Sequence, residues 1–224
     1  MEISGPLHIS NRSGAIRVEA QPGAELEVTG GHVERDEDGV LRVRGDSSSG
    51  ALLVTCAPAT DLVIGSQSGS VKVHGPVGDV SVATVSGKVR IDNAERVDVR
   101  TKSGTVEIGW CSGDCHVVVI SANVNVQQAA RAFLAAVSGH VTVGELDEAH
   151  VKTVSGSVEL GARAGGRVKV KSVSGHVEIS VPRDTAPCTK LSSLSGSIQC
   201  ECPKGHDGEI KVATVSGTID IACR

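Results

Sequence analysis

The stretch from Ser138 to Ile179 reads SGHVTVGELDEAHVKTVSGSVELGARAGGRVKVKSVSGHVEI. It contains one phrase three times: Ser-Gly, any residue, then an apolar-x-apolar triplet. The phrase recurs on both sides, from Ser68–Val73 to Ser216–Ile221, with a degenerate copy at Ser121–Val126. The glycines of successive phrases lie 17 to 21 residues apart. A period of this size is typical of repeat proteins, in which each unit buries its apolar face against its neighbours.

Each repeat contains two short strands separated by the Ser-Gly corner. The second and fourth residues after each corner glycine are almost always Val, Ile or Leu, and this alternation predicts a half-buried strand. The fifth and seventh residues before it are mostly Val, Leu or Ala and predict a second strand. We therefore expect an all-β fold, a parallel β-solenoid (single-stranded β-helix) of about nine short coils stacked about 4.8 Å apart. A propeller is the alternative, because two repeats would supply the roughly 40 residues of one blade.

The repeat register suggests the domain organisation. Residues 1–60 alternate less regularly and are expected to form a β-rich N-terminal cap, while residues 61–224 form the solenoid repeat domain. Gln127–Ala136 has strong helix propensity, but the register places it in a strand. No comparable cap follows the last repeat, so we expect the C-terminal coil to be a bare stacking surface.

Composition narrows the classes of function. Aromatic residues make up 1% of the 224 residues, and the formal net charge of -4 argues against nucleic-acid binding. The first residues lack the pattern of a signal peptide, and no apolar run approaches the length of a membrane span. We expect no membrane insertion and a cytoplasmic protein, or a cell-surface protein if a longer precursor exists.

Two sets of outward positions are candidate interaction sites. One is a basic face before the corners, where stacked lysines repel one another unless an acidic partner or an anion lies across them. Its members are Lys152, Lys169, Lys171, Lys190 and Lys211. This face is either a solvated surface or the basic half of a self-association with an acidic face after the corners. The other set is an apolar patch that includes both aromatic residues, namely Trp110, Val118, Phe133 and Ala135.

Catalytic and metal-binding patterns are not found in the sequence. The repeated serines occupy corners, and no Ser/His/Asp arrangement or phosphate-binding glycine loop is present. Cys115 and Cys200 fall on inward positions and are expected to be buried, whereas Cys202 and Cys223 occupy adjacent coils, near enough to pair. We therefore expect no enzyme activity, no cofactor and no metal.

Four phrases of the form T-x-S-G-x-V-x-V carry a family resemblance. They are Thr84–Ile91, Thr101–Ile108, Thr153–Leu160 and Thr214–Ile221. The chain resembles the bacterial putative-adhesin family of β-strand-repeat domains, a domain of unknown function. More distantly it resembles the bactofilins, which are polymer-forming scaffolds. The family resemblance implies a β-repeat fold and supplies no catalytic residues.

The sequence thus predicts a non-enzymatic structural or protein-interaction module built on a β-solenoid. Its partner would be another protein or a second copy of the chain, so a homo-oligomer is expected as one outcome. The alternatives are a self-polymerising, bactofilin-like scaffold that stacks through its C-terminal coil, and a surface adhesin.

Overall fold

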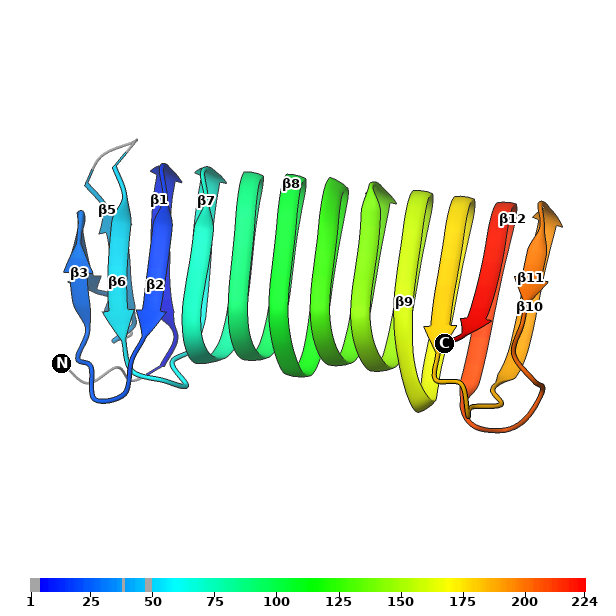
Figure 1. Cartoon of the computed structure of the whole chain (residues 1–224). Coiled ribbons are helices and arrows are strands. Elements are labelled where there is room, and N and C mark those ends of the chain that lie inside the picture. Colours follow the sequence, from blue (N-terminus) through cyan, green and yellow to red (C-terminus); the bar gives the residue numbers. More distant parts are fainter. Residues whose placement is uncertain (1–4, 38, 47–49) are drawn as a thin grey trace. The chain divides into compact units, whose positions relative to one another are not determined.

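The structure, a computed structural model, describes residues 5–37, 39–46 and 50–224, and within these ranges the chain forms strands and no helix (Figure 1). Two compact units divide it, Met1–Ser112 and Gly113–Arg224, and each is described by itself. The strands are β1 (Leu7–Ser13), β2 (Ile16–Ala20), β3 (Glu27–Thr29), β4 (Gly31–Arg35), β5 (Leu41–Gly45), β6 (Leu52–Cys56), β7 (Leu62–Ser68), β8 (Val71–Ser138), β9 (His140–Val181), β10 (Cys188–Ser195), β11 (Ile198–Cys200) and β12 (Glu209–Cys223).

The two longest strands each contain several turns of the chain. β8 and β9 comprise 68 and 42 residues, and each continues through several Ser-Gly corners. In the second unit, β8 pairs with β9 in a parallel register that joins Val124 to Val141 and Leu134 to Val151, one repeat further along the chain. Pairing of like positions between successive repeats is β-solenoid-like. It excludes the propeller, whose blades consist of antiparallel strands.

The corner requires glycine. Gly156 has a φ of 129°, and a Cβ at this position would collide with the carbonyl oxygen of Gly139 in the preceding corner. Thr153 completes the corner by donating a hydrogen bond of 3.2 Å from its buried hydroxyl to the carbonyl oxygen of Ser155. Thr84, Thr101 and Ser172 make the same bond in their own corners. In these four corners the buried polar side chain is thereby satisfied, whereas the buried hydroxyls of Thr214 and Ser193 have no hydrogen-bond partner among the described residues.

The interior of each unit is narrow and filled by aliphatic side chains. Val158 and Ile179 are fully buried, as are the matching residues of neighbouring coils. Gln127–Ala136 lies within β8, so its helix propensity is overridden as expected, because Ala129, Ala132 and Leu134 occupy inward positions.

The first unit arranges its strands out of chain order. β1 pairs in parallel with both β5 and β7, and β2 pairs in parallel with both β6 and β8. The N-terminal strands therefore lie between a coil made of β5 and β6 and a coil made of β7 and the start of β8. β3 adds to β6 and β4 adds to β5, both antiparallel.

The second unit contains a similar exchange. β12 pairs with β9 on one side and with β10 and β11 on the other, so the last coil in the chain lies between two earlier ones (Figure 1). The inward residues of β12 are more apolar than those of the displaced coil, which carries Thr189, Ser193 and Cys200 at matching positions. Insertion buries Ile210, Val212, Ile219 and Ile221 almost completely.

This exchange corrects two expectations from the sequence. The bare terminal coil is formed by β10 and β11, not by the last residues of the chain. Cys200 is exposed, although the repeat register predicted that it would be buried, because no further coil of the unit covers it. Cys115 is buried as predicted, and Cys202 forms a disulfide with Cys223 that ties the end of the terminal coil to β12.

The inward position of Val158 can be tested by Val158→Asp. The substitution places an unpaired carboxylate in an aliphatic interior, so we expect a loss of at least about 3 kcal/mol in the free energy of unfolding. Val154→Asp is the matched control, because Val154 belongs to the same coil but is half exposed, and it should change stability by about 0.5 kcal/mol or less. Thermal unfolding followed by circular dichroism measures both, and equal melting temperatures would contradict the register.

The geometry of the corner predicts that Gly156→Ala destabilises the protein more than Gly65→Ala does. Gly65 has no positive φ and no atom near the position of an added Cβ, whereas Gly156 has both constraints. Gly156→Ala should therefore lose about 2 to 4 kcal/mol of unfolding free energy, and Gly65→Ala should change it by less than about 1 kcal/mol. Chemical denaturation gives both values, and a fully stable Gly156→Ala protein would refute the stacked-corner geometry.

Candidate interaction surface

Three columns of side chains cover the outer face of the strands that precede the corners in the second unit. We call this surface the outer face; it comprises the residues six, four and two positions before each corner glycine. The first column contains His116, Phe133, His150, Lys169, Lys211 and Lys190. The second contains Val118, Ala135, Lys152, Lys171, Ala213 and Ser192. The third contains Ile120, Val137, Val154, Val173, Val215 and Leu194. Strand register joins Phe133 to His150, Ala135 to Lys152 and Lys211 to Lys169.

The exchanged coils set the order of the predicted basic face. Lys211 lies between Lys169 and Lys190, because β12 lies between β9 and β10. Glu209 partly neutralises this end, with its carboxylate 2.7 Å from Nζ of Lys211 and 3.4 Å from Nζ of Lys190. The hydrogen bond from Lys211, helped by Lys190 and opposed by burial, lowers the pKa of Glu209 below its usual value.

The other three lysines of the basic face keep their charge uncompensated. Lys152, Lys169 and Lys171 are exposed, and no carboxylate among the described residues forms an ion pair with them. Lys152 and Lys171 lie on the second column and Lys169 on the first. The outer face is therefore electropositive in its central part, although the chain as a whole is acidic.

Beside the lysines lies an apolar column that the sequence analysis missed. Its six members in the second unit are between 47% and 84% exposed, and all are aliphatic: Ile120, Val137, Val154, Val173, Val215 and Leu194. The backbone here is held by the corner serines, since Ser138, Ser155 and Ser174 donate hydrogen bonds to the carbonyl oxygens of Ile120, Val137 and Val154. The sequence feature that could have predicted this column is the residue before each Ser-Gly, which is Val, Ile or Leu in most repeats. A polar residue would be expected at an exposed position with no partner.

The four residues of the predicted apolar patch are divided between the two units. Trp110 is 53% exposed and belongs to the first unit, whereas the other three belong to the second. Phe133 is half-buried between the rings of His116 and His150, with centroid distances of 6.5 and 5.5 Å. Val118 is partly exposed and Ala135 is half-buried. The three patch residues of the second unit thus belong to the part of the outer face formed by its earliest coils, where the ring of Phe133 packs between two imidazoles.

The strands after the corners carry opposite charge. Glu159, Glu178 and Asp220 occupy the same position in their coils, and the register joins Asp220 to Glu178. Histidines and the C-terminal arginine lie beside them, with His176 3.5 Å from Asp220 and Arg224 2.9 Å from Glu178. The predicted acidic face is therefore present in the second unit but is partly compensated.

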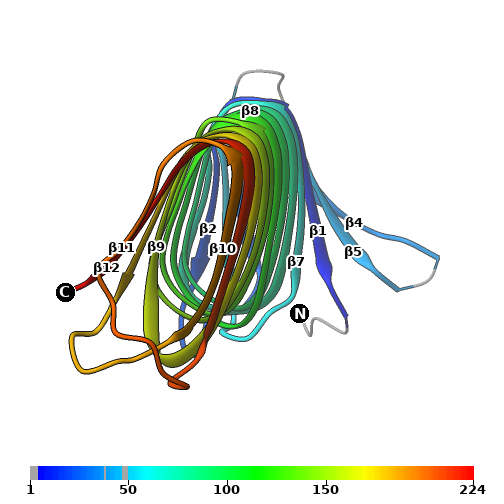
Figure 2. The same ribbon diagram turned by 90° about the vertical axis from the view of Figure 1, so that its right-hand side faces the viewer.

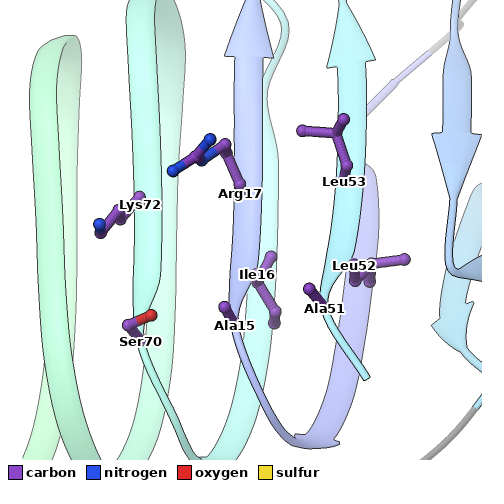
Figure 3. A pocket seen from close by; sticks show the side chains of 8 residues that line it. All are labelled: Ala15, Ile16, Arg17, Ala51, Leu52, Leu53, Ser70 and Lys72. Atoms are coloured by element: carbon purple, nitrogen blue, oxygen red, sulfur yellow. The ribbon is translucent and has the colours of Figure 1, made fainter. Parts of the chain in front are cut away.

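The first unit contains a pocket of about 340 Å³ over β2, β6 and β8 (Figure 3). Its lining is largely apolar and includes Ile16, Leu52 and Leu53, and it also includes Arg17 and Lys72, which lie opposite each other on neighbouring strands. The alternation of residues along the strands could have predicted that the two cations point outward, but it could not have predicted the pocket. Such a pocket has the chemistry to hold an anion with an apolar part.

Groups with the chemistry of catalysis are dispersed. Among the described residues, no cluster of three His, Cys, Asp or Glu side chains could hold a metal ion. One close pair of a histidine and a carboxylate is formed by His74 and Asp92, with 2.7 Å between Nδ1 and the carboxylate. Burial acts to raise the pKa of Asp92, but hydrogen bonds from His74 and Arg90 outweigh it and lower that pKa. In the described part of the chain, His74 and Asp92 form no hydrogen bond with a Ser, Thr or Cys side chain.

No helix in the described part of the chain is long and apolar enough to cross a membrane.

Comparison with known proteins places the chain in a family. A crystal structure of a "putative adhesin" from Bacteroides fragilis NCTC 9343 is 13% identical, with a TM-score of 0.47 over 99% of this chain and 94% of that one. A "putative cell adhesion protein" from Clostridium sporogenes ATCC 15579 is 10% identical, with a TM-score of 0.21 over 100% and 97% of the two chains. No curated protein matches the sequence. The family model described as Toastrack DUF4097 matches residues 5–148, which is more than half of the chain and agrees with the resemblance carried by the T-x-S-G-x-V-x-V phrases. The chain belongs to the Toastrack DUF4097 family.

Proposed function

We propose that this protein is a non-enzymatic protein-interaction module, and that the outer face of its second unit binds an acidic and partly apolar surface of a partner protein. The uncompensated charge of Lys152, Lys169 and Lys171 beside an exposed aliphatic column is the observation that carries the proposal. Lysines at neighbouring positions of adjacent strands repel one another, so a partner carboxylate laid across them relieves repulsion and gains attraction.

The apolar column supplies the part of the binding energy that charge does not. Burying half-exposed Val137, Val154 and Val173 removes aliphatic surface from water, and the stacked corners already hold these residues at fixed spacing. Rows of cations and rows of aliphatic side chains run parallel on the outer face. A partner segment that alternates Asp or Glu with Val, Ile or Leu matches both rows. Nucleic acid is a poorer fit, because the outer face offers no exposed aromatic platform and the net charge is -4.

Other features of the sequence prediction stand as proposals beside this one. We propose about nine coils in all, and a β-rich cap formed by residues 1–60, with residues 61–224 as the solenoid repeat domain. A self-polymerising scaffold is the second candidate function, favoured by the terminal coil of β10 and β11, which pairs on one side only among the described residues. A surface adhesin is the third, and both cytoplasmic and cell-surface locations stay predictions.

Peptide selection tests the outer face. Random peptides displayed on phage should, after selection on the whole chain at low salt, be enriched in sequences that alternate acidic and aliphatic residues. Synthetic copies should bind the Lys152→Glu/Lys171→Glu double variant at least about tenfold more weakly, because both substitutions turn attraction into repulsion. Binding to the unmodified chain should also weaken as salt is raised.

Lys204→Glu is the matched control, since Lys204 is exposed on the loop after β11 and lies outside the outer face. It makes the same change in charge as each single substitution of the double variant, and it should leave peptide affinity within about twofold. Selected peptides without acidic bias, or equal losses in the control and the double variant, would contradict the proposal.

A further inference from the structure

The terminal coil of the second unit has an open edge. Within the described residues, β10 and β11 pair with β12 on one side and with no strand on the other (Figure 2, where this coil faces the viewer). The backbone hydrogen bonds made to the neighbouring coil show which N–H and C=O groups of β10 and β11 have no partner in the part of the chain that the structure describes. Ser197 and Glu201 bond toward β12, and so does Cys188 at the start of β10. Because such groups alternate along a strand, Ile198, Cys200, Leu191 and Ser193 direct their N–H and C=O groups away from the unit.

The side chains of the same residues occupy inward positions, which are buried in the other coils. Leu191 and Cys200 occupy the positions at which Val212 and Ile221 are buried one coil further in. Here Leu191 is half-buried, Cys200 is exposed and Ile198 is 44% exposed, and the buried hydroxyl of Ser193 has no hydrogen-bond partner. The edge therefore combines unpaired backbone groups with uncovered apolar side chains, a combination that folded proteins usually protect.

Protection of this kind is present at the edge of the first unit. There the coil of β5 and β6 is covered by the antiparallel strands β4 and β3, and β4 is an exposed strand that carries His32, Glu34 and Arg35. Short, charged, antiparallel strands do not offer a parallel edge on which another coil could continue the stack. Head-to-tail growth therefore lacks a receiving surface among the described residues, and the edge that remains open can be met by the same edge of another copy.

We propose that two copies of this chain form a closed, two-fold symmetric dimer through the open edges of β10 and β11. β10 runs toward the corner at Ser195 and Gly196, and β11 runs away from it. A two-fold axis parallel to the strands and passing between these two corner residues therefore lays β10 of one copy antiparallel to β11 of the other. Both strands of each copy become paired, which satisfies the outward backbone groups at both edges.

This axis determines the register. It sets Leu191 opposite Cys200 of the second copy, and Ser193 opposite Ile198 of the second copy; all four residues direct their backbone groups outward and their side chains toward the interior. On the outer side it sets Lys190 opposite Glu201 of the second copy. The edge is thus complementary to itself in hydrogen bonding, in apolar character and in charge, and two Lys190–Glu201 pairs form in each dimer.

Charge reversal tests the contact. Sedimentation velocity over a concentration series should show the whole chain passing from 22.9 kDa to twice that mass, without larger species. Lys190→Glu or Glu201→Lys alone should raise the dimer dissociation constant about tenfold or more, because each places like charges opposite each other twice. The double variant Lys190→Glu/Glu201→Lys restores opposite charges and should recover the affinity of the original chain.

A cross-link tests the register separately. Residues opposite each other in a hydrogen-bonded antiparallel pair have Cα atoms about 5.5 Å apart, a distance that a disulfide spans. Leu191→Cys should therefore form a covalent dimer with the native Cys200 under a mild oxidant, whereas Ser192→Cys, one residue further along and on the other side of the strand, should not. The Leu191→Cys/Cys200→Ser variant should lose the cross-link and shows that Cys200 is the partner.

Several outcomes would overturn the proposal. A monomer at every concentration, growth to open-ended polymers, or a dimer unaffected by either single reversal would each refute it. The Lys152→Glu/Lys171→Glu variant should dimerise normally, since both residues lie away from the edge. Dimerisation and peptide binding can therefore fail independently of each other.

Discussion

The structure depends on one steric constraint, which is the stacking of corner glycines. At the Ser-Gly corners of the repeats the backbone takes a positive φ and passes so close to a neighbouring corner that a Cβ would meet its carbonyl oxygen, as Gly156 shows above Gly139. Only glycine adopts both conditions without strain. In several corners the hydroxyl of the Thr or Ser three residues earlier bonds the carbonyl oxygen of the residue before the glycine, as between Thr153 and Ser155. With the corner held at the same place in each coil, strands on both sides stack with like residues opposite each other, and a narrow aliphatic interior suffices without aromatic side chains.

The same stacking places outward side chains in columns, and this is what gives the surface its chemistry. A single Lys or Val on a strand is an ordinary surface residue, but repetition at a fixed spacing produces a row of cations beside a row of aliphatic groups. The alternation of β-strands assigns inward and outward positions so strictly that Val158 is fully buried while Val154, four residues earlier in the same coil, is half exposed. The rows of this surface therefore have the spacing of a β-sheet.

Both units place strands out of chain order, and the consequence is largest at the end of the second unit. β12 buries four aliphatic residues between β9 and the coil of β10 and β11, and that coil, with Thr189, Ser193 and Cys200 at its inward positions, is left at the edge. The Cys202–Cys223 disulfide joins the displaced coil to the inserted one. The less apolar coil thereby takes the edge of the second unit, where a neighbouring coil covers it on one side only among the described residues.

The sequence by itself determined the fold class, the corners and the inward ladder, because steric demands at the Ser-Gly corner and the period-two alternation act within a few residues and leave a repeated local pattern. It also determined which lysines face outward and that Gln127–Ala136 would be a strand. It did not determine the order in which coils stack, since repeats that share one pattern are interchangeable by local criteria and only their total burial distinguishes the arrangements. For that reason the exposure of Cys200, the position of Lys211 between Lys169 and Lys190, and the identity of the open edge were decided by tertiary structure alone. The position of Phe133 between two imidazoles likewise depends on which residues the neighbouring coils place beside it.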